Sequence, residues 1–229
     1  LRALSERLVY LRNLEEKKAS VLATIEEQGK LTDELKKQIE AVMTMVALED
    51  LYRPYRPKRR TRATIAREKG LEPLAEILRA QATTRTIEEE ATAFVDAEKG
   101  VESVQDAIDG AKDILAEVYA DDADYRTKLR AMTKESGSLV AKAKDEEADS
   151  VYEMYYDFSE PIKKLVGHRI LAINRGEAEK FLTVKIEAPR QGILLWLVKQ
   201  IIGNMKHDSA SYLYEAITDS YDRLIAPSI

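Results

Sequence analysis

The sequence predicts a mainly α, multi-helical protein, and three observations lead to this fold class. Glycine and proline are scarce, with 9 and 6 residues in a chain of 229, which is about half of their usual share. Apolar residues recur at helical spacing along most of the chain, and a single segment alternates with the period of a strand. We therefore expect a helical hairpin, an embedded helix-turn-helix-like part and at most a short β element.

The N-terminal part of the chain is predicted to form the hairpin. Aliphatic residues line one face of a first helix up to Gln28, and Gly29 supplies its C-terminal stop. Thr32 is the expected N-cap of the second helix, because acidic residues follow it in the first turn. The apolar stripe of the second helix continues to about Leu51, so one helix of about twenty residues, or about 30 Å, is expected here.

Shorter helices with clear start signals are predicted next. Thr61 can cap a helix over Arg62–Lys69, which Gly70 ends, and Pro73 lies in the first turn of the following helix. Helix, glycine turn and helix form the outline of a helix-turn-helix. The second helix carries few donors for base edges, so we interpret this part as a packing unit.

Two further helices are expected in the middle of the chain. Ser103 and Asp106 have the spacing of a capped helix start. Another helix extends from about Asp122 to Lys134 and ends before Gly137.

The last third of the chain is predicted to contain the one strand. Phe181–Glu187 alternates apolar and polar residues with a period of two. Ser138–Lys144 is too short to assign, and the polar stretch that follows it into Phe158 is expected to be helical and to end at Ser159–Pro161. Ile193–Met205 is apolar around most of its circumference, which places it in a core or under a neighbouring domain.

These elements suggest a discontinuous organisation of the chain. A final helix extends to Pro227. We expect a helical body formed by residues 1–60 and 137–229, with residues 61–136 embedded in it as a helix-turn-helix-like helical subdomain.

Charge is unevenly distributed along the chain. The net charge is -5, yet Arg53–Arg62 holds six cations and no acid, whereas Arg85–Asp124 holds thirteen acids against three bases, a local balance of -10. Pro54 and Pro57 oppose a regular helix, so the basic segment is predicted to be a loop. The candidate nucleic-acid-binding residues are its cations and two neighbouring tyrosines: Arg53, Arg56, Lys58, Arg59, Arg60, Arg62, Tyr52 and Tyr55.

Two interpretations of this basic segment stay open. In the first, Arg59, Arg60 and Arg62 form ion pairs with acids of the 85–124 region and hold the connection against the helical body. In the second, the guanidinium groups contact phosphates, and the two tyrosines stack on the bases of a single-stranded ligand.

The sequence offers few residues of the types that enzymes use for catalysis. The absence of cysteine excludes a thiolate zinc site and a cysteine nucleophile, and capping or packing is expected for His168 and His207. No phosphate-binding glycine loop or Gly-x-Ser-x-Gly motif occurs, and Asp121–Asp124 lacks the spacing of a calcium loop. We expect no enzymatic activity, metal or cofactor. Because the apolar run Gly192–Val198 is too short for a bilayer, we expect a cytoplasmic protein without membrane contact.

Several stretches of the sequence resemble those of a known protein family. The hallmark is Tyr55–Ala75, with the sequence YRPKRRTRATIAREKGLEPLA. Four further stretches agree in order and spacing: Glu90–Gly100, Tyr156–Pro161, His168–Gly176 and Ser220–Ser228. Together these stretches resemble the N-terminal region of the bacterial Tex family of RNA-binding transcriptional accessory proteins, and the resemblance covers nearly the whole chain.

The resemblance implies a string of modules, in which this helical region precedes an RNase H-like domain, helix-hairpin-helix motifs and an OB-fold RNA-binding domain. It implies that the chain is a non-enzymatic N-terminal scaffold fragment, and that RNA or DNA is bound mainly through the absent modules. The basic loop would add an electrostatic contact. The alternative is a protein-interaction module that docks polymerase, other transcription machinery or the missing domains. Apolar surface exposed by truncation is expected to allow dimerisation of the isolated fragment.

Overall fold

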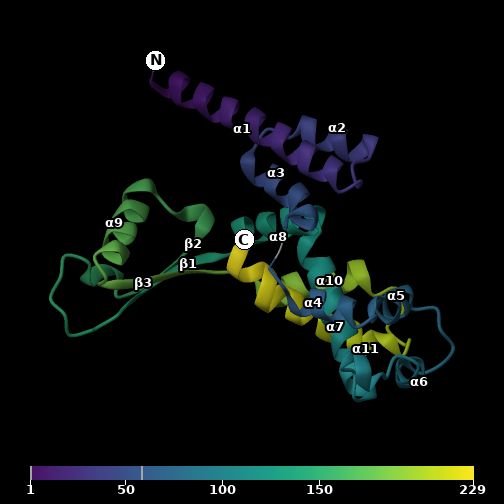
Figure 1. Cartoon of the computed structure of the whole chain (residues 1–229). Helices are drawn as coiled ribbons and strands as arrows, with labels where there is room; N and C mark the ends of the chain where they lie inside the picture. The colour runs from purple at the N-terminus through teal and green to yellow at the C-terminus, as the bar shows by residue number, and fades with distance from the viewer. Residues whose placement is uncertain (1, 58) are drawn as a thin grey trace.

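Helices make up most of the structure, a computed structural model that describes residues 2–57 and 59–229 (Figure 1). The described helices are α1 (Arg2–Glu27), α2 (Asp33–Ala41), α3 (Met45–Tyr52), α4 (Arg62–Glu68), α5 (Glu72–Ala80), α6 (Ile87–Thr92), α7 (Val104–Asp121), α8 (Ala123–Ser136), α9 (Gly167–Ala178), α10 (Arg190–Ile201) and α11 (Ser209–Asp219). The described strands are β1 (Ser138–Ala143), β2 (Asp157–Pro161) and β3 (Leu182–Glu187). The prediction of a mainly α protein with a short β element is confirmed.

The helices α1, α2 and α3 enclose a small core of their own. Its fully buried members include Leu14, Ile25, Ile39 and Leu48. Gly29 ends the first helix with a positive φ of 66°, a conformation that glycine adopts without strain. The N-terminal hairpin thus has its own hydrophobic cluster.

The prediction of one continuous helix up to about Leu51 was wrong. The helix α2 ends at Ala41, and α3 begins at Met45, so three residues separate the two helices. The Thr44 hydroxyl accepts a hydrogen bond from the amide of Ala47 at 3.2 Å, and the Tyr10 hydroxyl accepts one from the amide of Met45 at 2.7 Å. These bonds satisfy two amides at the start of α3, so the chain can break and turn there.

The largest core belongs to the body of the molecule, where α7 packs against α4, α5, α6 and α11. The start and stop signals of this part are confirmed. Thr61 caps α4, Gly70 follows it with a φ of 80°, and Ser103 forms a capping box with Asp106 at the start of α7. Asp122 caps α8, which ends before Gly137.

A three-stranded antiparallel sheet in the order β2-β1-β3 forms the β element. The predicted strand is confirmed as β3. The unassigned segment Ser138–Lys144 contains the central strand β1, and Ser159–Pro161, expected at a helix end, belongs to β2. Val140 pairs with Ser159 on one side and Lys185 on the other, so β1 depends on partners distant in sequence.

The sheet and α10 are each covered on one face only in the described part of the chain. The helix α9 covers one face of the sheet around the buried residues Tyr152, Ile173 and Leu182. In α10, Leu197 is buried, whereas Leu195 is 58% exposed. The apolar segment Ile193–Met205 is therefore only partly in the core, and its helix ends at Ile201.

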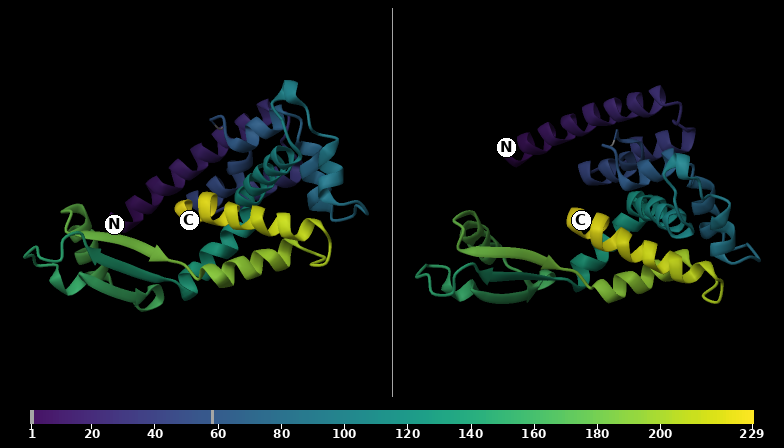
Figure 2. Two further views of the ribbon diagram at one scale, coloured as in Figure 1. Left: turned by 90° about the horizontal axis from the view of Figure 1, so that it is seen from below. Right: turned by 60° about the horizontal axis from the view of Figure 1, so that its bottom comes forward.

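The described residues thus group into three hydrophobic clusters: the hairpin, the body and the sheet with α9. Figures 1 and 2 show the sheet and α9 at one end, away from α4, α5 and α6 of the body. The predicted division into residues 1–60 with 137–229 and an embedded 61–136 stays a prediction. In the part of the chain that the structure describes, no helix is both long enough and apolar enough to cross a membrane.

Candidate nucleic-acid interface

The basic segment connects the hairpin to the body. Arg53–Tyr55 continues α3 as one turn of 3-10 helix, and Pro54 fits there because the first turn of a helix leaves its amide unbonded. The backbone becomes extended at Arg56 and reaches α4 through the N-cap Thr61. The predicted loop is therefore shorter than expected by this one helical turn.

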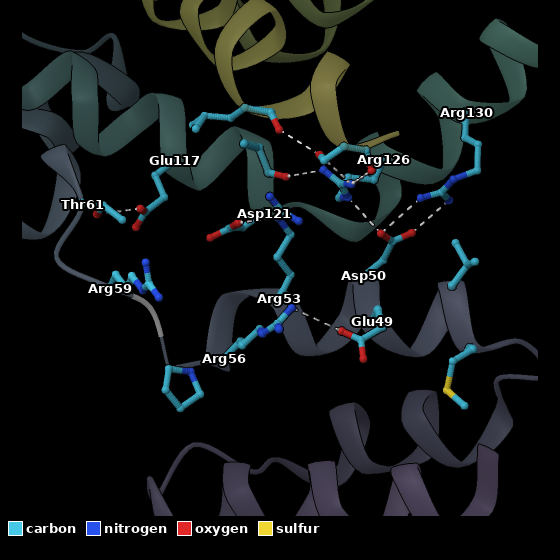
Figure 3. A pocket seen from close by; sticks show the side chains of 16 residues that line it. Glu49, Asp50, Arg53, Arg56, Arg59, Thr61, Glu117, Asp121, Arg126 and Arg130 are labelled. Atoms are coloured by element: carbon cyan, nitrogen blue, oxygen red, sulfur yellow. Dashed lines mark hydrogen bonds and ion pairs between the residues drawn. The ribbon is translucent and has the colours of Figure 1, made fainter. Parts of the chain in front are cut away.

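A cavity of about 600 Å³ lies beside this segment (Figure 3). Its wall combines α3, the basic segment, the end of α7, α8 and the C-terminal residues. The polar and charged lining residues are Glu49, Asp50, Arg53, Arg56, Arg59, Thr61, Glu117, Asp121, Arg126, Arg130 and Ser228. The fold thus brings five arginines and four carboxylates to one cavity.

Two of the predicted cations are held by acids at the cavity. Arg53 Nε lies 3.1 Å from Asp121 Oδ1, and its side chain is half-buried. Arg56 is exposed, and its Nη1 lies 3.8 Å from Glu49 Oε2. Arg53 therefore ties the basic segment to α7, while Arg56 stays at the rim.

The remaining cations face solvent. Arg60 Nη2 lies 2.7 Å from Glu68 Oε2 in α4. Arg59 and Arg62 are exposed, and within residues 2–57 and 59–229 neither forms an ion pair. Lys58 lies outside the described residues.

These contacts correct the interpretation that Arg59, Arg60 and Arg62 form ion pairs with acids of the 85–124 region. The acidic 85–124 region does hold the connection, but it does so through Arg53, Thr61 and Arg67. Thr61 donates a hydrogen bond to Glu117 Oε2 at 2.9 Å, and Arg67 Nη1 donates to Glu117 Oε1 at 2.9 Å. Among the described residues, Arg59, Arg60 and Arg62 form no ion pair with that region, although the charge of Arg62 acts on Asp113 in α7.

The two tyrosines pack against the hairpin. Tyr52 is buried in the hairpin core, with Lys17 Nζ 5.7 Å from its ring centroid. Tyr55 is half-buried, and its carbonyl accepts a hydrogen bond from Gln28 Nε2 at 2.8 Å. The buried Tyr52 ring offers no face to a base, which corrects the expectation that this ring is available for stacking.

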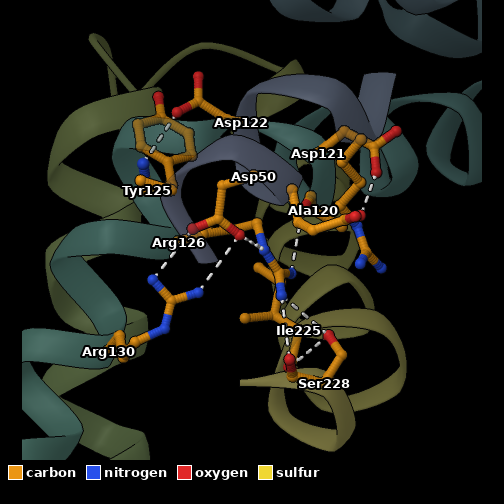
Figure 4. Close-up of polar contacts among 12 residues, drawn as sticks. Asp50, Ala120, Asp121, Asp122, Tyr125, Arg126, Arg130, Ile225 and Ser228 are labelled. Carbon is orange, nitrogen blue, oxygen red and sulfur yellow. Dashed lines mark hydrogen bonds and ion pairs between the residues drawn. The ribbon is translucent and has the colours of Figure 1, made fainter. Parts of the chain in front are cut away.

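A buried ion network forms the inner wall of the cavity (Figure 4). Arg126 Nε donates to Asp50 Oδ1 at 2.9 Å, and Arg130 donates to both oxygens of Asp50 at 3.0 and 3.2 Å. Arg126 Nη2 also donates to the carbonyl of Ser228 at 3.1 Å. Burial lowers the pKa of the Arg126 guanidinium, while its hydrogen bond to Asp50 acts in the opposite direction.

Sequence reasoning missed this network. Arg126 shares one face of α8 with the buried residues Leu129 and Thr133, three and seven positions further on. A charged residue in a core-facing position of a helical stripe is the signal that could have pointed to it. The position of its partner, Asp50, 76 residues earlier, required the tertiary structure.

The charged side chains of the cavity are buried or partly buried on its inner wall and exposed at its rim. Inside, the single buried carboxylate of Asp50 faces two guanidinium groups, those of Arg126 and Arg130, so these three side chains carry one net positive charge. At the rim, Arg56 and Arg59 are exposed to solvent. These exposed guanidinium groups can bind a phosphate at the rim and along the outer face of the basic segment.

The histidines do not line this cavity. His207 hydrogen-bonds to the Ser209 hydroxyl at 2.7 Å and to the carbonyl of Thr83 at 3.0 Å, while His168 is exposed in the first turn of α9. Among the residues described, no three histidine, aspartate or glutamate side chains are grouped so as to hold a metal ion.

A family profile and several known proteins match this chain in sequence. A family profile described as "Tex central region-like" matches residues 82–210. The uncharacterized protein YdcI of Bacillus subtilis is 44% identical over 232 residues, which cover 100% of this chain and 32% of that protein.

Two named relatives extend the comparison. The transcriptional accessory protein Tex of Neisseria gonorrhoeae is 43% identical over 190 residues, covering 82% of this chain and 25% of that protein. The human S1 RNA-binding domain-containing protein 1 is 29% identical over 242 residues, covering 99% of this chain and 24% of that protein. The chain thus spans between about a quarter and a third of the length of these relatives. Since the matching profile covers more than half of its residues, the chain belongs to the Tex family.

Proposed function

We propose that this chain is a non-enzymatic helical scaffold within a nucleic-acid-binding transcription accessory protein, and that its basic segment adds an electrostatic contact to phosphates. The names of two relatives support the first part, since one is a transcriptional accessory protein and the other contains an S1 RNA-binding domain. The non-enzymatic role is supported by the absence of cysteine and by the hydrogen bonds that hold His207 to Ser209 and to the Thr83 carbonyl.

The exposed arginines of the basic segment are the single observation that carries the phosphate contact. Arg59 and Arg62 are exposed and form no ion pair within the described residues. An exposed guanidinium group that is not in an ion pair can form bidentate hydrogen bonds to a phosphate without first breaking such a pair. Because these contacts address the backbone of a nucleic acid, they position the ligand and carry no sequence information.

A gel-shift series on single-stranded RNA and duplex DNA at two salt concentrations tests this proposal. The variant Arg59→Glu/Arg62→Glu is expected to lower affinity at low salt by about tenfold, because two phosphate contacts are lost and repulsion replaces them. The slope of log affinity against log salt for single-stranded RNA is expected to become shallower by about 1.4, or about 0.7 for each lost contact.

A matched control has the same change of charge at another place. Lys36 and Lys37 are exposed on α2 of the same hairpin, so Lys36→Glu/Lys37→Glu changes the net charge equally without touching the basic segment. The proposal predicts that this control binds RNA more tightly than Arg59→Glu/Arg62→Glu. If both variants lose the same affinity for RNA, the effect is one of net charge and not of a contact at the basic segment. If neither variant loses affinity, the phosphate contact is refuted.

The second candidate function is a protein-interaction module. It is favoured by large apolar side chains that are exposed on helices, such as Leu195 in α10 and Leu171 in α9. Under this function, Arg59→Glu/Arg62→Glu leaves both RNA binding and thermal stability unchanged, whereas Leu195→Asp weakens binding to polymerase or to other domains of the relatives.

A further inference from the structure

The N-terminal turns of α1 extend beyond the hairpin core. The Tyr10 hydroxyl of α1 accepts a hydrogen bond from the Met45 amide, and Leu14 is the first buried residue of this helix. Before that point, Leu4 is 70% and Leu8 is 48% exposed. Figures 1 and 2 show this half of α1 projecting away from α2 and α3.

The apolar residues of this projecting part form a ridge of their own. Leu4, Leu8 and Leu11 follow one another at spacings of four and three residues, which is the a/d pattern of helices that pair side by side. At 3.6 residues per turn, this leucine ridge is rotated by roughly 90° from the buried face that contains Leu14 and Ile25. Leu11 also packs against the hairpin core, so the part of the ridge that the core leaves uncovered is formed by Leu4 and Leu8.

Both flanks of the leucine ridge are basic. Arg7 lies on one side of the ridge and Arg12 on the other, and neither forms an ion pair with any described residue. Arg7 lies over the Tyr10 ring, 4.9 Å from its centroid. The one acid between Arg2 and Arg12 is Glu6, which points to the opposite face and pairs with Arg2 at 2.8 Å.

We propose that the leucine ridge is a docking surface for an amphipathic helix of a partner protein, which presents leucine-type residues at heptad spacing and carries acidic residues on both flanks. Such a helix would cover Leu4 and Leu8 while its carboxylates meet Arg7 and Arg12. Three turns of α1, about 16 Å, are available, so the contact is small and suits a transient complex. This inference is independent of the phosphate contact at the basic segment.

Charge argues against a second copy of the chain as the occupant. In a parallel pair Arg7 would face Arg12 of the other copy, and in an antiparallel pair each arginine would face its own counterpart. Like charges at the flanking positions of paired helices disfavour that pairing. A lipid surface is disfavoured as well, because interfacial helices present a wide apolar face, whereas this ridge has about two apolar residues in seven.

The test uses the 229-residue chain and two labelled synthetic peptides of three heptads. Both peptides carry leucine at a and d, one with glutamate at e and g and the other with lysine there. Fluorescence anisotropy at low salt is expected to show binding of the glutamate peptide and at least about tenfold weaker binding of the lysine peptide. The variant Arg7→Glu/Arg12→Glu is expected to reverse this preference.

Substitutions on and off the ridge complete the test. Leu4→Asp/Leu8→Asp is expected to weaken binding of the glutamate peptide by about tenfold or more. Val9→Asp is the control, because Val9 is also exposed but lies off the ridge, and it should bind as the parent chain does. These substituted positions are exposed, and circular dichroism verifies that the helical content is unchanged.

Three outcomes would overturn the proposal. The first is equal binding of both peptides, or of neither. The second is a concentration-dependent dimer in sedimentation that Leu4→Asp/Leu8→Asp abolishes, which would make a second copy the occupant. The third is ridge-dependent binding to vesicles of anionic lipid without binding to the glutamate peptide.

Discussion

Asp50 is the acid that pairs with both arginines of the buried ion network. Its carboxylate is buried and accepts hydrogen bonds from Arg126 and Arg130, which come from α8. A buried pair of this kind adds little net stability by itself, because desolvation of both charges offsets their attraction. Loss of one partner is costly, however, since the remaining charge is then buried without compensation.

The variant Asp50→Ala is therefore expected to lower the free energy of unfolding by about 3–5 kcal/mol, because the Arg126 guanidinium would stay buried without its carboxylate. Urea denaturation followed by circular dichroism measures this change. Arg130→Gln is the milder comparison, since the Arg130 side chain is 35% exposed and a lost charge there is screened by water. A similar, small loss in both variants would contradict the prediction.

Asp113 in α7 gives a prediction about pH. Burial raises the pKa of its carboxyl above the ordinary 3.8, although Arg223 Nη2 lies 3.5 Å away and Arg62 also favours the charged form. The folded state therefore disfavours the ionised form. The contribution of Asp113 to stability is fully present below 3.8 and is lost as the pH rises through the folded pKa.

Asp113→Asn is accordingly expected to raise Tm at pH 7, by an amount that shrinks as the pH is lowered towards 3.8. Thermal melts of both proteins across this range measure the difference. If the variant melts below the parent chain at pH 7, the pairing with Arg223 outweighs the burial of the carboxyl.

At the scale of elements, α7 is the helix against which α4, α5, α6 and α11 pack, and the turn between α4 and α5 lies especially close to it. A Cβ at Gly110 would lie 2.3 Å from Leu71 Cδ1 and 3.3 Å from Ala66 Cβ. Both of these neighbours are buried, and they lie at and before the turn between α4 and α5. The missing side chain of Gly110 thus lets that turn pack directly on the α7 backbone.

Gly110→Ala is expected to lower the free energy of unfolding by about 1–3 kcal/mol, since a methyl group would overpack the contact with Leu71. Gly192→Ala in α10 is the control, because nothing lies within 4 Å of the added Cβ. There the helix propensity of alanine is expected to add about 0.5–1 kcal/mol. Stabilisation by both substitutions would show that Leu71 moves aside at little cost.

At the scale of the whole molecule, ion pairs connect the hairpin core to the body core. The described hydrophobic clusters share no buried residue. Across the joint, Arg53 pairs with Asp121, and Asp50 pairs with Arg126 and Arg130. The Asp50–Arg126 pair is buried, whereas Arg53 and Arg130 are about one-third exposed, and separate cores joined in this way are expected to open as separate units.

Hydrogen exchange measured by mass spectrometry can test this separation. The variant Arg53→Gln/Arg130→Gln removes two half-exposed partners, worth about 1 kcal/mol together, so amides of α1, α2 and α3 are expected to exchange about fivefold faster. Amides of α9 and β1 should exchange as before, because their core lies in the sheet. Equal acceleration throughout the chain would mean that the molecule opens as one unit.

The features that were predictable from the sequence depend on neighbours a few residues apart. Thr61 caps α4 through the amide of Thr64, and Ser103 and Asp106 close their capping box within one turn. Gly70 ends α4 because its positive φ suits glycine. Helix period, cap chemistry and the charge of the basic segment are local properties, so the sequence by itself determined the helical class, several helix boundaries and the candidate cations.

Other features arise from contacts between residues that are far apart in the chain. The Tyr10 hydroxyl supports the start of α3 after the break, and β1 exists as a strand because β2 and β3 pair with it from both sides. Arg126 meets Asp50 across 76 positions, and Tyr52 is buried by the hairpin. A short apolar segment can form a helix or a strand, and only packing against residues far away in the chain decides between them. The same long-range packing decides which cations of the basic segment stay exposed, and Arg59 and Arg62 do.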